Sequence, residues 1–404
     1  MNYSSSKIID SITSLSKEKL IKGSLCFALE HGYSLACWSK PESSKWDILL
    51  DQDATLLSED RSPSIHTLES GYLIAPFNSN KKKYLIKNNM HIVLDKTITI
   101  QIKDGSENAF ESFETYLNNT DTSITHFLKK HTNTEETTSE FYISGVDKAK
   151  QCIQDEKFQK VVLSRSKTID APVEALEKVL LELRASYPHS CIAAFYQPEI
   201  GLWITATPEL LLTTDAAGTF KTVALAGTQK YNPAIPVRDV SWTHKEIEEQ
   251  ALVSRYIIGC FKTIRLRNYV EIGPRTIQAG NILHLKTEFT AHTTEVNMSE
   301  IGTTMLELLH PTSAVCGMPK VSALDFIAHN ESFDRKLFSG YSGPVNIEKE
   351  TFLFVTLRCA NIHADKITLY AGAGITADSD AEKEFEETEL KMNVIGAVFS
   401  KLTI

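Results

Sequence analysis

The sequence lacks a long apolar run. Its apolar stretches, such as Ser190–Pro198 and Tyr256–Phe261, are far shorter than the ~20 residues that a membrane-spanning helix needs. The first residues show no basic stretch followed by an apolar segment, so we expect no secretory signal. These absences argue against a membrane protein and against an exported one.

Paired cysteines and basic clusters are also missing. The 7 cysteines are an odd number and include no Cys-x-x-Cys pair, which disfavours a disulfide framework and a thiolate zinc site. We therefore expect a reducing compartment and a cytoplasmic protein. The net charge is -9, without a long basic run, which disfavours nucleic-acid binding. An anionic substrate would need local cations.

Signatures of several enzyme classes are absent too. The sequence contains no Gly-x-Ser-x-Gly, no His-Glu-x-x-His and no recognisable Ser-His-Asp or Cys-His arrangement. His284 and His310 are lone histidines beside apolar residues. We interpret them as core histidines or as supports for other site residues.

What is present is a chain of 404 residues, 42% of them apolar, which is enough for a large core. We interpret residues 1–135 as one irregular, mostly β part that opens with a helix over Ile8–Leu20. A polar linker follows over Lys129–Ser139. Turn-forming residues separate the strands expected in this part, which are Ser24–Ala28, Ser34–Trp38, Gly71–Ala75, Ile92–Leu94 and Thr97–Ile102.

Residues 140–404 carry denser signals. Strand-like runs lie at Lys160–Ser164, Cys191–Tyr196, Leu202–Ala206, Phe352–Cys359 and Lys366–Ala371, with the second and third paired and the last two adjacent. Helical periodicity covers Val173–Ser186, Thr243–Phe261 and Ser379–Ser400, the last with Ser379 and Asp380 as cap candidates. Strands and helices do not alternate regularly, so the pattern predicts a mixed α+β, or α/β, unit.

Two of the expected helices share an acidic pattern. Glu246 and Glu249 are three residues apart and lie on one helical face, and Glu384 and Glu387 repeat this spacing, with Lys391 one turn beyond. Together the two faces would place four carboxylates in one pocket. Such hard oxygen ligands suit Mg²⁺. The alternative is that each acidic run is a solvated helix surface.

The segment Tyr370–Ala377 matches the dinucleotide-binding pattern Gly-x-Gly-x-x-Ala. Too few residues follow it to complete a dinucleotide fold, and Asp378 and Asp380 would repel a pyrophosphate. We favour the simpler interpretation that Gly372 and Gly374 let the backbone approach a small ligand or a neighbouring element.

Lys160 and Glu209 are candidates for proton transfer. Lys160 opens an apolar strand, where it is either a snorkelling surface lysine or a desolvated base. Glu209 follows Thr207-Pro208 and precedes three leucines. Burial there would raise its pKa and suit a general acid, although an ordinary glutamate at a strand edge is equally compatible with this context.

Several segments, taken in order, resemble the chorismate-binding enzymes, a family that includes isochorismate, salicylate, anthranilate and aminodeoxychorismate synthases. The resemblance covers residues ~140–400, is looser over the first ~135, and rests on the whole ordered set. Its segments are Lys160–Arg165, Thr207–Leu211, Leu225–Thr228, Lys245–Glu249, Leu309–Val315, Phe333–Arg335, Thr356–Arg358, Tyr370–Gly374 and Glu384–Thr388 with Lys391.

The resemblance implies one large unit with two β-sheets around a central site that binds chorismate and Mg²⁺. Glu249 and Glu387 would bind the metal directly, with Glu246 and Glu384 acting through water. The metal would hold the ring carboxylate.

The remaining roles come from the same resemblance. Arg358 and Lys391 would hold the enolpyruvyl carboxylate beside Gly372 and Gly374. Thr228 and Ala314 would also line the substrate site, Lys160 would be the base and Glu209 the acid.

Ala314 favours isochorismate synthase, in which water attacks the ring, because family members that use ammonia or make salicylate generally carry threonine there. Those two reactions remain alternatives, as does a non-catalytic chorismate binder. Gln250 replaces the family's usual histidine, and Phe338 stands where some relatives have tyrosine. We expect a monomer or a weak dimer with chorismate as its partner, serving menaquinone or siderophore synthesis.

Overall fold

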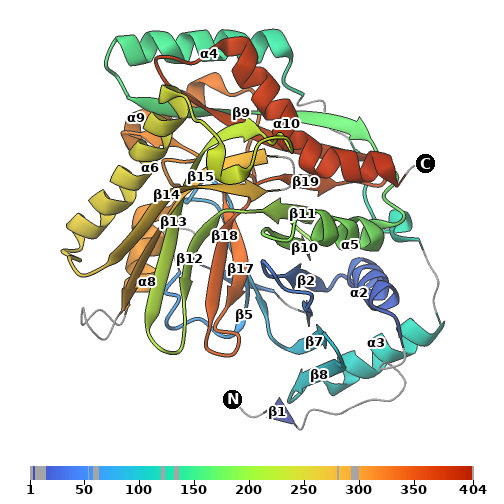
Figure 1. The fold of residues 1–404 in the computed structure, drawn as a ribbon. Coiled ribbons are helices and arrows are strands. Elements are labelled where there is room, and N and C mark those ends of the chain that lie inside the picture. Colours follow the sequence, from blue (N-terminus) through green and yellow to red (C-terminus); the bar gives the residue numbers. More distant parts are fainter. Residues whose placement is uncertain are drawn as a thin grey trace.

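Two antiparallel β-sheets form the framework of the computed structural model (Figure 1). The structure describes residues 3–4, 15–52, 54–57, 63–119, 123–131, 136–279, 282–292 and 300–402. The 11-stranded sheet has, in spatial order, β1 (Tyr3–Ser4), β8 (Ile98–Lys103), β7 (Met90–Leu94), β3 (Trp46–Asp51), β2 (Ser34–Ser39), β10 (Cys191–Gln197), β11 (Gly201–Thr207), β19 (Cys359–Ile362), β20 (Lys366–Ile375), β9 (Lys160–Asp170) and β16 (Gly317–Met318).

The second sheet has nine strands. In spatial order they are β14 (Val270–Ala279), β15 (Ile282–His292), β13 (Thr219–Lys230), β12 (Leu210–Thr214), β18 (Thr351–Val355), β17 (Tyr341–Val345), β5 (Gly71–Ala75), β6 (Lys83–Lys87) and β4 (Thr55–Leu57). The first 135 residues supply strands to both sheets. The two sheets and the mixed α/β class are those that the sequence predicts.

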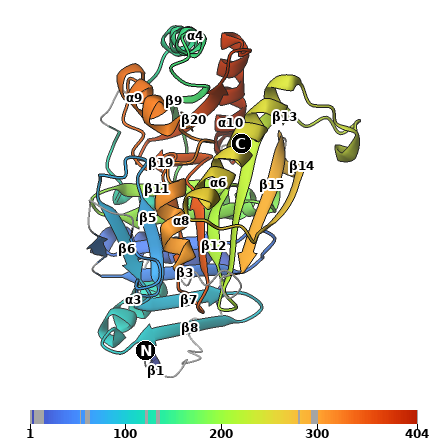
Figure 2. The same ribbon diagram turned by 90° about the vertical axis from the view of Figure 1, so that its left-hand side faces the viewer.

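Helices cover the outer faces of the sheets. They are α2 (Lys17–His31), α3 (Glu107–Asn119), α4 (Ser139–Gln154), α5 (Leu176–Ser186), α6 (His244–Thr263), α8 (Ile301–Leu309), α9 (Lys320–Asn330) and α10 (Ala381–Lys401), with short 3₁₀ turns η1 (Ile124–His126) and η2 (Val237–Asp239). Figures 1 and 2 show α4, α9 and the start of α10 at one end of the molecule and α3 at the other. None of the described helices is apolar over enough length to cross a membrane.

Four clusters of apolar side chains hold the described part of the chain together. One lies between the larger sheet and α2, α3, α5 and α10, a second between the smaller sheet and α6 and α8, and a third between the sheets. The fourth packs α4 and α9 against β9 and β20. Strand β2 shows how both faces of a strand are used: Trp38 packs between the sheets, whereas Cys37 packs toward the helices. Burial of both faces explains why the four central residues of this strand, 35–38, are all apolar rather than alternating.

Most of the predicted elements are confirmed, with local differences. The paired strands appear as β10 and β11, with Ile192 opposite Ala206. Helix α10 begins after Asp380, whose side chain accepts a hydrogen bond from the Lys383 N–H. The predicted strand over Ser24–Ala28 is wrong, because these residues lie inside α2. A run of four apolar residues does not distinguish a strand from the buried face of a helix.

Two further predictions need comment. The single strand expected over Phe352–Cys359 is wrong, since β18 ends at Val355 in one sheet and β19 begins at Cys359 in the other. The helix expected over Ile8–Leu20 lies mostly outside the described residues, as does the middle of the Lys129–Ser139 linker; helix α2 begins at Lys17.

Candidate active site

Two neighbouring crossovers carry the chain between the sheets. Glu209 joins β11 to β12, and Arg358 lies between β18 and β19. Main-chain hydrogen bonds fasten both: Val355 N–H donates to the Glu209 carbonyl at 3.0 Å, and Ala206 N–H donates to the Arg358 carbonyl at 2.9 Å. Arg358 has a φ of 45°, a left-handed conformation that is rare outside glycine and concentrates at functional sites. The seam between the sheets thus carries two charged residues.

A pocket opens at this seam. Its walls include all six residues predicted to contact substrate, together with Glu209 and Glu249: Thr228, Ala314, Arg358, Gly372, Gly374 and Lys391. They come from both sheets, the α8–β16 loop and helices α6 and α10. The structure therefore gathers residues that are more than 180 positions apart in the sequence into one pocket.

Lys160 lies directly behind this pocket at the start of β9, where its side chain is fully buried. Its Nζ is 3.0 Å from Glu249 Oε1. A Cβ atom on Gly374 would lie 2.3 Å from Glu249 Oε1 and 2.8 Å from Lys160 Cε. Glycine is needed there because the ion pair packs directly against β20.

Glu209 is buried in the pocket wall, and burial raises its pKa to about 7. The charges of Lys160, Arg358 and Lys391 oppose that rise without cancelling it. A carboxyl group with this pKa is part protonated near neutral pH, as a general acid must be.

Arg358 is supported by His284. The His284 Nδ1 lies 2.8 Å from the Gly227 carbonyl, so we assign the proton to Nδ1. Its Nε2 then accepts a hydrogen bond from Arg358 Nη2 at 3.2 Å. Burial, helped by Arg358, lowers the pKa of His284 to about 3, so the ring stays neutral.

Arg358 and Lys391 supply the local cations that an acidic protein needs for an anionic substrate. Burial lowers the pKa of Arg358 to about 10, which leaves it charged at neutral pH. Among the described residues, none accepts a hydrogen bond from its buried Nη1. Lys391 Nζ donates to the Gly372 carbonyl and to Glu387 Oε1, both at 2.7 Å.

Each of the four predicted metal-binding glutamates has a partner within the protein. Besides the Glu249 pair, Glu387 meets Lys391, and Glu384 Oε1 lies 2.6 Å from Lys245 Nζ. Glu246 closes the capping box at the start of α6, accepting a hydrogen bond from the Thr243 N–H at 3.0 Å.

Electrostatics shows that these groups lie close together. Burial and the nearby Glu387 raise the pKa of Glu384. Burial also acts to raise the pKa of Glu249, but Lys160, Lys245 and Lys391 outweigh it and hold that pKa below its usual value. For Lys245, burial acts to lower the pKa, and three carboxylates reverse that effect to give a net rise.

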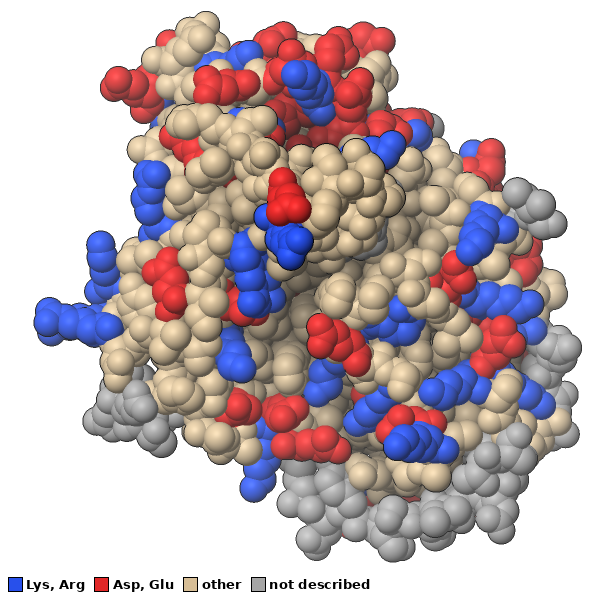
Figure 3. Space-filling model, viewed as in Figure 1, with Lys and Arg blue, Asp and Glu red and all other residues tan. Residues whose placement is uncertain are grey.

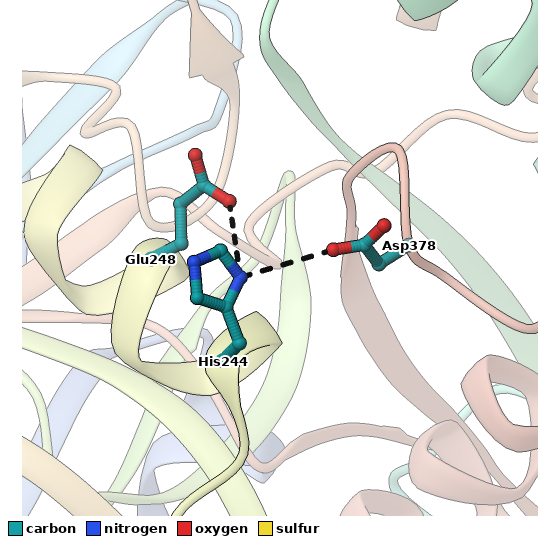
Figure 4. A group of neighbouring side chains, drawn as sticks. All are labelled: His244, Glu248 and Asp378. Carbon is teal, nitrogen blue, oxygen red and sulfur yellow. Dashed lines mark ion pairs between the residues drawn. The ribbon is translucent and has the colours of Figure 1, made fainter.

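The glutamates are hard oxygen donors beside the pocket, a chemistry that fits Mg²⁺. Lysine ammonium groups are the counter-ions of Glu249, Glu384 and Glu387. Their oxygens do not gather within 4.8 Å of one another in groups of three. Across the part of the chain that is described, one group of that kind occurs, formed by His244, Glu248 and Asp378 (Figure 4). It is exposed, and its ion pairs are long, at 3.9 Å.

The glycine-rich segment belongs to a strand. Ala371–Ile375 pairs with Val161–Arg165 of β9, so it forms no turn for a pyrophosphate, and the dinucleotide alternative fails. A Cβ on Gly372 would lie 2.6 Å from Ser164 Oγ. The glycines permit close contact with neighbouring elements, as the simpler interpretation predicts.

Two further groups shape the site without having a predicted role, Lys245 and a buried ion pair, whereas His284 supports Arg358, which is one of the two interpretations that the sequence leaves open for it. In that pair, Arg335 Nε donates to Glu331 Oε2 at 2.7 Å, and both side chains are at most 4% exposed. Arg335 also binds the carbonyls of Val162 and Val315, both of which line the pocket. An i,i+4 charge pair does not reveal such contacts before the fold is known.

Arg358 and Lys391 suit the pocket to an anionic small ligand, and comparison with known proteins names the class. A family model for chorismate binding enzymes matches residues 68–400, and the chain belongs to this family. Isochorismate synthase EntC of Escherichia coli K12 is 32% identical over 252 residues, which cover 59% of this chain and 62% of the relative.

Two further comparisons agree. The vibriobactin-specific isochorismate synthase of Vibrio cholerae is 30% identical over 262 residues, covering 63% of this chain and 66% of the relative. The matches thus span less than two thirds of these relatives. The solved structure of MenF, the menaquinone-specific isochorismate synthase from Escherichia coli, has a TM-score of 0.71 over 93% of this chain and 91% of that chain, at 19% identity. This likeness confirms the predicted fold.

Proposed function

We propose that the protein is an isochorismate synthase, which converts chorismate to isochorismate with Mg²⁺ as cofactor. The observation that carries this proposal is that a candidate base, a candidate acid and two cations lie in or directly behind one pocket. Lys160 lies behind the pocket, whereas Glu209, Arg358 and Lys391 line it. Family membership and the names of the relatives support the substrate class.

In the proposed reaction, Lys160 takes a proton from a water molecule as the water oxygen bonds to C2 of the ring. The ring double bonds shift, the C4–oxygen bond breaks, and Glu209 protonates the departing hydroxyl, which leaves as water. One water enters and one leaves, so atoms and charge balance. At the start Glu209 must be protonated, which its raised pKa allows, and Lys160 must be neutral, which requires its ion pair with Glu249 to be broken.

Binding follows from the charges around the pocket. Arg358, held by His284, and Lys391 would take the enolpyruvyl carboxylate. Glu249 and Glu387 would hold Mg²⁺, which when bound neutralises and orients the ring carboxylate. This requires both glutamates to exchange a lysine partner for the metal.

Water as the nucleophile is supported by Ala314, whose small side chain lines the pocket. The alternatives are salicylate synthesis and amination by ammonia, as in anthranilate and aminodeoxychorismate synthases. A cytoplasmic enzyme fits the odd number of cysteines, which form no disulfide among the described residues.

The test is to incubate the protein with chorismate and Mg²⁺, with and without ammonium, and to separate the products by chromatography. Isochorismate as the sole product in both cases is expected. Salicylate with pyruvate, or a product that forms only with ammonium, would overturn the assignment in favour of another branch of the family. A matched incubation with EDTA should give no product, and undiminished turnover there would contradict the metal requirement.

A further inference from the structure

Lys245 occupies a position that its own helix does not favour. It is the second residue of α6, where the helix macrodipole places partial positive charge and disfavours a cation. The cap of this helix is already complete, because Thr243 and Glu246 form a capping box. The cap therefore does not need Lys245, and its ion-pair partner lies outside α6.

Its contacts show where that role lies. Lys245 Nζ is 2.6 Å from Glu384 Oε1 on α10, and the two side chains are 18% and 2% exposed. It also interacts electrostatically with Glu249 and Glu387. One ammonium group thus compensates carboxylates from both helices, including the two that we assign to the metal.

Lys245 differs from the other two lysines that meet these glutamates. Lys391 lines the substrate pocket and Lys160 lies against its wall. Lys245 lines a separate, adjoining cavity together with Glu246, Glu384 and Glu387. Acidic side chains gather over the start of α10 on the face in Figure 3. Lys245 is therefore placed to meet the carboxylates and is absent from the substrate walls.

We propose that Lys245 is a built-in counter-ion that competes with Mg²⁺ for these carboxylates and keeps the affinity of the free enzyme for the metal low. The inference rests on the proposed function, since it takes Glu249 and Glu387 to be metal ligands. It implies that the metal is held firmly when substrate supplies further anionic oxygens, and is readily exchanged otherwise.

The experiment is calorimetric titration of Mg²⁺ into the substrate-free protein and into Lys245→Met. Removing a unit charge a few ångströms from the metal should tighten binding roughly tenfold. Lys245→Arg, which keeps the charge, should retain weak binding. Lys383→Met is the matched control: Lys383 lines the same cavity and is exposed, and its loss should change the affinity less than about twofold.

Thermal unfolding gives a second measurement. Without metal, Lys245→Met should melt below the wild type because its buried carboxylates lose a counter-ion, and Mg²⁺ should raise its melting temperature more than that of the wild type. Lys245→Gln repeats the test if the methionine variant does not fold. Equal or weaker Mg²⁺ binding by folded Lys245 variants would overturn the inference alone. An absence of Mg²⁺ binding by every protein, with or without chorismate, would overturn the proposed metal site itself.

Discussion

The strands that line the pocket and the helices that border it hold their charged residues by different means. Glu209 and Arg358 are fixed by main-chain hydrogen bonds at the seam between the sheets. Glu249, Glu384 and Glu387 are held on α6 and α10 by lysine partners. Main-chain bonds fix a position firmly, whereas an ion pair can exchange one cation for another. Residues that main-chain bonds hold in place suit proton transfer, whereas glutamates held by ion pairs suit a metal.

The most direct test of the proposed proton transfer is to remove the base or the acid. Lys160→Ala and Glu209→Gln should each lower turnover by at least a hundredfold, the usual range for a lost general acid or base. Lys160→Arg keeps a cation beside Glu249 but supplies no base, so it should be equally inactive. Circular dichroism should show native folding in all three, and near-normal turnover in any of them would refute the assigned roles.

The buried Glu331–Arg335 pair holds part of the pocket wall in place, because Arg335 binds the carbonyls of Val162 and Val315. Glu331→Gln leaves the Arg335 guanidinium buried without its counter-ion, which should cost about 3–5 kcal/mol in the free energy of unfolding. Urea denaturation measures it. Asp170→Asn is the control, because Asp170 is 90% exposed in its pair with Lys366, and it should leave the midpoint unchanged. Equal effects of the two changes on the urea midpoint would mean that the buried pair stabilises the fold no more than the exposed pair does.

The raised pKa of Glu209 should make both stability and turnover depend on pH. Its folded pKa of about 7 lies above the ordinary glutamate value of 4.5, so the folded state binds more protons between these values and stability falls as pH rises through them. The wild type should lose on the order of 3 kcal/mol relative to Glu209→Gln between pH 4.5 and 7, and little beyond. Turnover should decline above about pH 7. A pH-independent stability difference would contradict the raised pKa.

The smallest expected effect tests the space left for water. Ala314→Thr adds two heavy atoms to the pocket wall and should reduce isochorismate formation several-fold while leaving stability within about 1 kcal/mol. Progress curves followed by chromatography measure it. Unchanged kinetics would show that the side chain at position 314 does not limit the nucleophile.

Local patterns predict those elements whose stability is local. Helices α6 and α10 carry their caps and their periodicity in adjacent residues, and the β10–β11 hairpin is likewise local. The seam is different. The residues around Arg358 read as one strand, and the switch of sheets there depends on a left-handed backbone held by partners more than 150 positions away.

The same contrast holds for the site. The ordered resemblance predicts which residues line the pocket, but spacing alone could not show that each glutamate meets a partner within the chain. Those pairs join β9 to α6, α6 to α10, and one turn of α10 to the next. Pairs such as the first two depend on packing between elements, which periodicity does not encode. Gly374 illustrates this, because its need for a bare Cα arises from two side chains on other elements.

The central claim is that water bonds to C2 of chorismate while the C4 hydroxyl leaves, in the pocket between the sheets. Mass spectrometry of the product formed in ¹⁸O-labelled water tests this most directly. The account predicts isochorismate that carries one heavy oxygen, located at C2, and no such product from Lys160→Ala. Isochorismate that forms without the label, or labelled product formed equally well by Lys160→Ala, would contradict it.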